Sequence, residues 1–288
     1  PGHIVAVRPL VDGVISDFEV TAEMLTYFIK KVHSSGAQLF ARPRIVIGIP
    51  SGITEVERRA GRDAAKSAGA REVYLVEEPM AAAIGVRMPV QDAVGNMIVD
   101  VGGGTTDIAV LSLGGIVASA NLRLSGDRLN QDIINYARDE YKLLLGEKTA
   151  EELKIAIGAV LKLNEVLDST VRGRDLVTGL PREVRMTDGD IRVATAKTVR
   201  LIVDGVKDVV ESTPPELISD IMHRGILLVG GGAHLRELAV LIEQETKIPT
   251  RIAEDPMTAV VRGCGIIVEN LAEYKNVLLE REEEASPQ

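Results

Sequence analysis

The residues best suited to chemistry in this chain form one short run, from Asp100 to Asp107 (D-V-G-G-G-T-T-D). Apolar segments at 97–99 and 108–111 flank it, and both are typical of buried strands. Three glycines in such a turn let backbone amides approach a bulky anion, and two threonine hydroxyls add donors for phosphate oxygens. The acids at either end could hold a magnesium ion through its water shell. The run predicts a hairpin that binds nucleotide phosphates, with an ordinary glycine-rich turn as the alternative.

Two other kinds of phosphate loop do not fit the sequence. A Walker loop requires G-x-x-x-x-G-K-[ST], and the chain contains no such run. A dinucleotide fingerprint requires glycine at the sixth position of G-x-G-x-x-G and a helix after it, whereas this chain has Asp107 there. The β-branched residues that follow lead to Gly114-Gly115, which is a hairpin signal. We therefore expect the phosphates to meet a β-hairpin rather than the end of a helix.

Two further motifs have spacings that suit a nucleotide site. Glu77-Glu78-Pro79 lies at a predicted strand-to-helix junction, where a carboxylate could orient a water for attack on a γ-phosphate. The alternative is that these acids only complement the dipole of the helix N-terminus. Gly230-Gly231-Gly232 follows a predicted strand at 226–229, and such glycines allow a base or ribose to lie against the backbone. A simple strand-to-helix turn is the alternative for that motif.

Composition narrows the class of protein. The chain has 288 residues, enough for two domains, and its net charge of −9 argues against a general nucleic-acid surface. Its one cysteine, Cys264, excludes an intrachain disulfide and fits a reducing compartment. We expect this residue to be an inert packing residue. No apolar run approaches the length of a membrane span, and no signal peptide is visible.

Strand and helix signals alternate along the chain, which favours an α/β fold. Thr54 and Glu57 have the spacing of a capping box that opens a helix. The charged stretch 147–188 is predicted to be a small inserted lobe with two short strands joined by a turn at 178–181. We expect strands at 4–7, 44–49, 73–76 and 226–229, and helices at 22–33, 79–85, 125–145 and 188–211.

Taken together, these motifs resemble the actin-like ATPase superfamily and, within it, the MreB family of bacterial actins. The resemblance covers essentially the whole chain and implies an α/β, actin-like ATPase fold of two mixed-sheet domains with an inserted small lobe. Residues 1–95 would form the remainder of domain I, to which 256–288 returns. Residues 96–255 would form domain II, with the lobe at about 147–188. The stretches that carry the resemblance are 8–15, 43–59 (P-R-I-V-I-G-I-P-S-G-I-T-E-V-E-R-R), 77–85 (E-E-P-M-A-A-A-I-G), 171–181 (V-R-G-R-D-L-V-T-G-L-P) and 253–256.

The resemblance also implies roles for individual residues. Glu78 would position the attacking water, and Asp100 would hold the magnesium ion through a water. Asp107 stands where the family usually has glutamate, and residues 154–158 lack the glutamate that the family places near the ribose. The remaining roles in ATP binding fall to Gly102, Gly103, Gly104, Thr105 and Thr106 at the β- and γ-phosphates, Gly126 and Asp127 on the ribose side, Lys154 near the adenine-side helix, and Gly230, Gly231 and Gly232 at the adenosine floor.

Leu39 and Phe40 are two large apolar residues at the end of a polar loop. In the family such a loop inserts into the membrane surface. Burial of both side chains in lipid would contribute roughly 3–6 kcal/mol before entropy losses, which is too little for one monomer and sufficient for a filament that presents many copies. The alternative is that the pair packs back into the core.

The resulting prediction is an ATP- and Mg²⁺-binding cytoskeletal protein that forms homopolymeric filaments and hydrolyses ATP weakly. It would be cytoplasmic, peripheral on the inner face of the cell membrane, with cell-wall elongation proteins as partners and no nucleic acid. Only one hairpin of the D-x-G-T type occurs, so we expect an N-terminally truncated domain I and impaired turnover. A small-molecule kinase of the same fold is the alternative, although only 3% of residues are aromatic and none is tryptophan. A chaperone is a third possibility, disfavoured because no peptide-binding domain follows.

Overall fold

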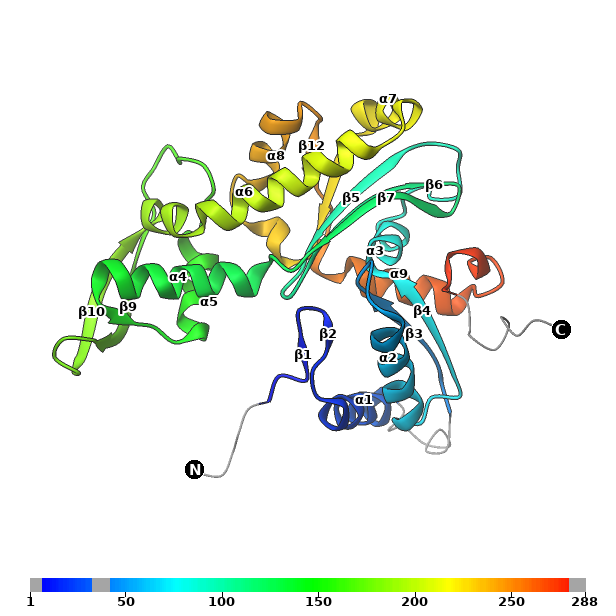
Figure 1. Ribbon diagram of the computed structural model, residues 1–288, viewed down its shortest axis with the longest axis horizontal. Helices are drawn as coiled ribbons and strands as arrows, with labels where there is room; N and C mark the ends of the chain where they lie inside the picture. The colour runs from blue at the N-terminus through cyan, green and yellow to red at the C-terminus, as the bar shows by residue number, and fades with distance from the viewer. Residues whose placement is uncertain (1–6, 33–41, 280–288) are drawn as a thin grey trace.

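The computed structural model describes residues 7–32 and 42–279, and a five-stranded mixed sheet lies at its centre (Figure 1). The strand order is β12-β11-β5-β6-β7. Strand β11 pairs in parallel with β5 and β12, whereas β6 pairs antiparallel with both β5 and β7. The predicted mixed α/β fold is therefore confirmed. The strands span Asn96–Val101 (β5), Thr106–Ser112 (β6), Gly115–Leu122 (β7), Ile226–Val229 (β11) and Thr250–Ile252 (β12).

Helices cover both faces of this sheet, which explains why β5 and β6 are buried along their whole length and mostly apolar. Successive side chains of a strand point to opposite faces. Met97 and Val99 accordingly pack in one cluster with residues of α6 and α8, while Ile98 packs in another with residues of α3 and α9. The helices around the sheet are α3 (Glu78–Gly85), α6 (Asp188–Ser212), α7 (Pro215–Arg224), α8 (Leu238–Thr246) and α9 (Ala259–Glu269).

A second unit is built on a parallel pair of strands, β3 and β4, with α1 and α2 beside it. Thr54 and Glu57 form the predicted capping box at the start of α2, and Gly69 follows that helix with a φ of +103°. Helix α9 packs against both β3 and α3, so it joins this unit to the central sheet. The elements are β1 (Leu10–Val11), β2 (Val14–Ile15), α1 (Phe18–Val32), β3 (Arg44–Ile49), α2 (Glu55–Ser67) and β4 (Glu72–Glu77).

A small lobe forms the far end of the molecule, at the left of Figure 1. It has its own apolar cluster, which includes Ile133 from α4, Leu153 from α5 and Met186 from β10. A turn at 176–180 joins the two long strands of the lobe, as predicted. The lobe contains α4 (Gly126–Tyr141), β8 (Leu143–Leu144), α5 (Glu147–Ile157), β9 (Asp168–Asp175) and β10 (Pro181–Thr187).

Some predicted element boundaries were wrong. The helix predicted at 125–145 ends at Tyr141, because Lys142 adopts a left-handed conformation (φ 53°) and the apolar residues after it form β8. Helix α1 begins at Phe18, earlier than predicted, and Val7 is not in a strand. Short 3-10 turns are found at Gly231–His234 (η2), Pro256–Thr258 (η3) and Lys275–Val277 (η4). Within the described ranges, no helix is long and apolar enough to pass through a bilayer.

Candidate nucleotide site

The glycine turn between β5 and β6 is open toward solvent at its centre. The amide of Gly102 donates to the carbonyl of Thr105 at 2.9 Å and so closes the turn. Gly103 is exposed, and a Cβ built on it would meet nothing within 4 Å. Thr105 and Thr106 are buried at its base, and the Thr106 hydroxyl donates to the carbonyl of Leu124 at 2.6 Å. The turn thus presents backbone amides rather than side chains.

Two acids lie directly across from each other below this turn. Asp100 on β5 is the register partner of Asp107 on β6, and their exposed fractions are 7% and 1%. Burial, reinforced by the charge of Asp107, raises the pKa of Asp100 to about 7. The carboxylate of Asp100 accepts no hydrogen bond from any described residue. Without a cation, this carboxylate is therefore partly protonated at neutral pH.

Glu78 begins α3 and faces the same pair of acids. Burial raises its pKa to about 8, and the charges of Asp107 and Asp100 add to the effect. Pro79, directly after it, occupies the first helical turn, where a missing N–H costs nothing. The structure thus brings together all three carboxyl groups that the sequence placed near the γ-phosphate.

Asp107 is held by protein donors on both of its oxygens. The backbone N–H of Ser51, after β3, donates to Oδ1 at 2.8 Å, and the Asn121 amide of β7 donates to Oδ2 at 2.9 Å. Its pKa is nevertheless raised, chiefly by burial. Because Ser51 belongs to the unit around β3, Asp107 ties that unit to the central sheet. Sequence reasoning missed both partners, which lie far from Asp107 in the chain.

The start of α4 is joined to the glycine turn by hydrogen bonds. The amides of Gly126 and Asp127 donate to the carbonyls of Gly102 and Gly103 at 3.1 and 2.9 Å, and the Ser125 hydroxyl also donates to Gly103. Lys154 of α5 donates from Nζ to the carbonyl of Gly126 at 2.9 Å, and its burial lowers its pKa. These predicted ribose-side and adenine-side residues therefore lie next to the phosphate turn.

The second glycine turn follows β11 and lies beside β5. Val229 is the register partner of Asp100, and Gly230 has a φ of +80°. A Cβ on Gly230 would overlap with Asp100 and with the backbone of Val101, so only glycine fits there. Gly231 is exposed, and a Cβ on it would also meet nothing within 4 Å.

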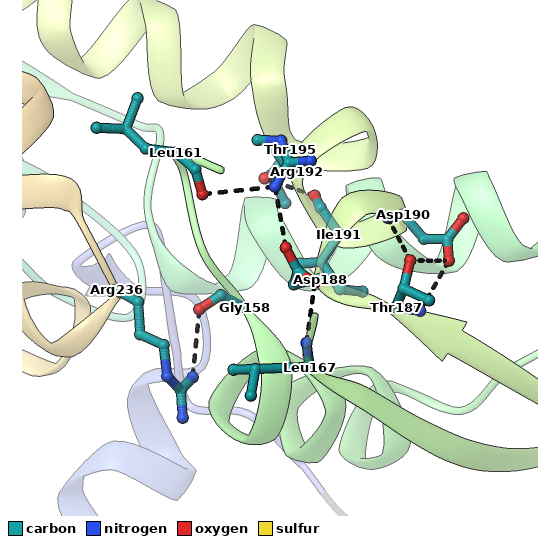
Figure 2. A network of polar contacts seen from close by, with 10 residues as sticks. All are labelled: Gly158, Leu161, Leu167, Thr187, Asp188, Asp190, Ile191, Arg192, Thr195 and Arg236. Carbon is teal, nitrogen blue, oxygen red and sulfur yellow. Dashed lines mark hydrogen bonds and ion pairs between the residues drawn. The ribbon is translucent and has the colours of Figure 1, made fainter. Parts of the chain in front are cut away.

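Arginine side chains hold the lobe in place relative to this second turn (Figure 2). Arg236, just after η2, donates to the carbonyls of Ile155 and Gly158 at 3.0 and 3.2 Å, at the end of α5. Arg192 of α6 pairs with Asp188 at 3.0 Å and also donates to the carbonyl of Leu161 at 3.4 Å (Figure 2). Arg236 thereby links the end of α5 to the segment that follows the second glycine turn.

The hairpin of β1 and β2 also reaches the phosphate turn, which sequence reasoning did not foresee. A Cβ on Gly104 would lie 2.8 Å from the amide nitrogen of Gly13, at the tip of this hairpin. Arg8, before β1, pairs with Asp127 at 3.4 Å and with Glu147 at 2.5 Å. The Asp-Gly pair at 12–13 is a strong hairpin signal that could have revealed this contact.

The residues present fit a nucleotide with a magnesium ion held through water. Gly103 and Gly231 are exposed with open space beside them. No described residue donates a hydrogen bond to the carboxylate of Asp100 or Glu78, so a nearby positive charge would relieve their repulsion. No group of three or more His, Cys, Asp or Glu side chains in the described part of the chain is arranged to ligate a metal directly. Magnesium usually keeps several of its waters, which matches this arrangement. Leu39 and Phe40, the predicted membrane pair, lie outside the described residues.

Solved structures with the same architecture place the fold in the actin-like class. The crystal structure of MreB5 of Spiroplasma citri bound to ADP matches with a TM-score of 0.87 and 36% identity, over 96% of this chain and 83% of that one. The MamK double helical filament matches with a TM-score of 0.77 and 23% identity, over 91% and 80% of the two chains, which shows the fold alone. The chain thus has an actin-like fold.

Sequence relatives narrow this class to one family. Residues 1–276 match the MreB/Mbl protein family. The cell shape-determining protein Mbl of Bacillus subtilis (strain 168) is 47% identical over 271 residues, which are 94% of this chain and 81% of that protein. The cell shape-determining protein MreB of Escherichia coli (strain K12) is 51% identical over 271 residues, covering 93% and 77%. The chain belongs to the MreB/Mbl family.

Proposed function

We propose that this chain is an ATP-binding cytoskeletal protein that polymerises into filaments on the inner face of the cytoplasmic membrane. Through cell-wall elongation proteins, these filaments would guide wall synthesis and control rod shape. The observation that carries the proposal is the β5–β6 turn, in which the exposed Gly103 lies near buried Asp100, whose carboxylate has no donor among the described residues. Two relatives named for cell shape and MreB5 structures with ADP and AMPPNP support it.

In this proposal the phosphates are bound chiefly by backbone groups. Gly102, Gly103 and Gly104 would line the β- and γ-phosphates, with Thr105 at the base of the turn. The amides of Gly103 and Gly104 would donate to the phosphate oxygens, whereas the Gly102 amide closes the turn by donating to Thr105. Thr106 and Asp107 would have a positioning role, because the hydroxyl of the first and both oxygens of the second already have protein partners. Gly230, Gly231 and Gly232 would support the adenosine, with Lys154 and the start of α4 opposite.

Asp100 and Glu78 would divide the chemistry between them. Asp100 would hold the magnesium ion through water, and the ion would neutralise charge on the phosphates. Glu78 would orient the attacking water and accept its proton, which requires the carboxylate form. Since its pKa is about 8 without a cation, Glu78 becomes an effective base only when positive charge enters the cluster. This dependence fits a slow, weak ATPase.

Membrane attachment in this proposal depends on Leu39 and Phe40 and on the number of copies in a filament. Sedimentation with ATP, with and without anionic lipid vesicles, tests polymerisation and attachment separately. The protein should pellet with ATP alone and bind vesicles, whereas the Leu39→Ala/Phe40→Ala variant should pellet with ATP but leave the vesicles. Val56→Ala, which changes an apolar side chain that is 78% exposed, is the matched control and should behave as wild type.

Two outcomes of this experiment would contradict the proposal. If the protein stays monomeric with ATP under all conditions, the filament role is wrong. If the double variant binds vesicles as wild type does, the role of these two residues is wrong while polymerisation can still hold.

A further inference from the structure

Three arginines surround a polar cavity of about 320 Å³ that shares no lining residue with the two glycine turns. Arg87 follows α3, Arg251 lies on the edge strand β12, and Arg262 lies on α9. Glu254 is the one acid in the cavity wall. The sequence brings these cations together from three separate segments, so no local motif reveals the cluster.

None of the three guanidinium groups forms an ion pair within residues 7–32 and 42–279. Arg262 donates to the backbone carbonyls of Glu254 and Asp255, both at 3.0 Å, and its Nε is buried without a partner. Arg87 is exposed and has a left-handed backbone (φ 59°), a conformation that is costly for a residue with a side chain. The cavity thus gathers three arginines beside a single acid, in a chain whose net charge is −9.

We propose that this cavity binds a small, multiply charged anion, namely a phosphate ester or a polycarboxylate. Guanidinium groups bind phosphate and carboxylate oxygens through paired, charge-assisted hydrogen bonds. With Glu254 subtracted, the three arginines leave two positive charges, which matches a dianion. The volume lies at the small end of the range for ligand pockets, which suits a small molecule rather than a polymer. Arg87 and Arg251 supply free donors, and the guanidinium of Arg262 adds a third positive charge to the wall.

Titration calorimetry on the full chain tests this site, with citrate and inorganic phosphate as probes. We expect one anion to bind per chain, with the tighter of the two probes identifying the ligand class. In Arg87→Gln/Arg251→Gln the affinity should fall at least about tenfold, because two charge-assisted contacts are lost. Neither side chain has a hydrogen-bond partner among the described residues, so this variant should fold normally. Arg59→Gln, on the exposed face of α2, is the matched control.

The experiment must distinguish anion binding at this cavity from binding at the nucleotide site. The same titration in the presence of excess ADP and magnesium should give unchanged anion binding, because the two sites share no residue. The proposal is wrong if wild type binds neither probe, if the double variant binds as tightly as wild type, or if ADP displaces the anion. Failure of ADP to bind would not affect this result, so the inference is independent of the proposed function.

Discussion

Asp100 and Asp175 have the same small exposed fraction, 7% each, yet their pKa values move in opposite directions. Asp175 ends β9 and accepts the N–H groups of Val177 and Thr178, both at 2.8 Å, and an ion pair from Arg182 at 3.0 Å. These donors lower its pKa to about 2. Asp100 has no such donors and faces Asp107, so its pKa rises to about 7.

The difference separates an aspartate that stabilises local structure from one suited to a ligand. Asp175 receives its counter-charge and its hydrogen bonds from the lobe itself, and it fixes the turn between β9 and β10. Asp100 lies in a cluster of buried acids that has no positively charged partner. A bound cation would supply the positive charge that the protein does not. Deep burial beside a second acid at Asp100, and local hydrogen-bond donors at Asp175, therefore distinguish the two sites.

The largest expected effect of a substitution is on the rate of ATP hydrolysis. Asp100→Asn should reduce magnesium-dependent ATP hydrolysis by roughly 100-fold or more, because the neutral amide no longer attracts the metal. Asp175→Asn is the matched control in the lobe and should leave hydrolysis near the wild-type rate. Phosphate release assays on filaments of each variant measure this. If both variants lost ATP hydrolysis equally, the different surroundings of the two aspartates would have no bearing on function.

Glu78→Gln should have the next largest effect. Loss of the proton acceptor should slow hydrolysis by about 100-fold, while the affinity for ATP changes little because Glu78 does not hold the phosphates. Single-turnover kinetics and equilibrium binding separate the two quantities. A loss of affinity with an unchanged rate would assign Glu78 to binding instead.

Stability of the ligand-free protein should fall as the pH rises from about 5 to about 8. The raised pKa values of Asp100 and Glu78 mean that the folded state binds more protons than the unfolded state in this range, so deprotonation favours unfolding. Since one pKa unit corresponds to about 1.4 kcal/mol, Asp100 alone accounts for a change of a few kcal/mol. Urea unfolding at several pH values measures how steeply the free energy of unfolding falls with pH. Asp100→Asn should flatten it, and an unchanged slope in this variant would contradict the account.

The contribution of Asp175 to the free energy of unfolding should have the opposite pH dependence and should be smaller than that of Asp100. Its lowered pKa contributes stability above the unfolded-state pKa near 4, and this is lost as the pH falls toward about 2. Asp175→Asn should lower the free energy of unfolding at neutral pH measurably, because an ion pair and two backbone hydrogen bonds weaken. Asp63→Asn, whose pair with Arg59 is exposed, should cost about 0.5 kcal/mol or less. Similar losses in the two variants would argue against the structural role of Asp175.

Local patterns in the sequence predicted much of the fold. The capping box at Thr54 and the strand 226–229 follow from neighbouring residues alone. Helix α7 was not among the predicted helices, because two successive prolines are typical of turns, whereas Pro215 opens a helix at a position where proline is tolerated. The end of α4 was misplaced because the apolar pattern continues into β8 while the backbone reverses at Lys142.

The candidate site was only partly predictable for a related reason. The glycine turn and its acids are contiguous, so their chemistry is visible in one stretch of sequence. The partners of Asp107 and the three arginines of the cavity come from distant segments. Their proximity depends on how β3, β7, β12 and α9 pack, and that packing leaves no trace in local spacing.

The most direct test of the central claim is calorimetric titration of ATP into the protein with magnesium and with a chelator. Wild type should bind ATP with magnesium and more weakly without it, whereas Asp100→Asn should bind equally weakly in both conditions. Absence of ATP binding to the wild-type protein, or the same dependence on magnesium in the variant, would contradict the assignment of the β5–β6 turn and Asp100.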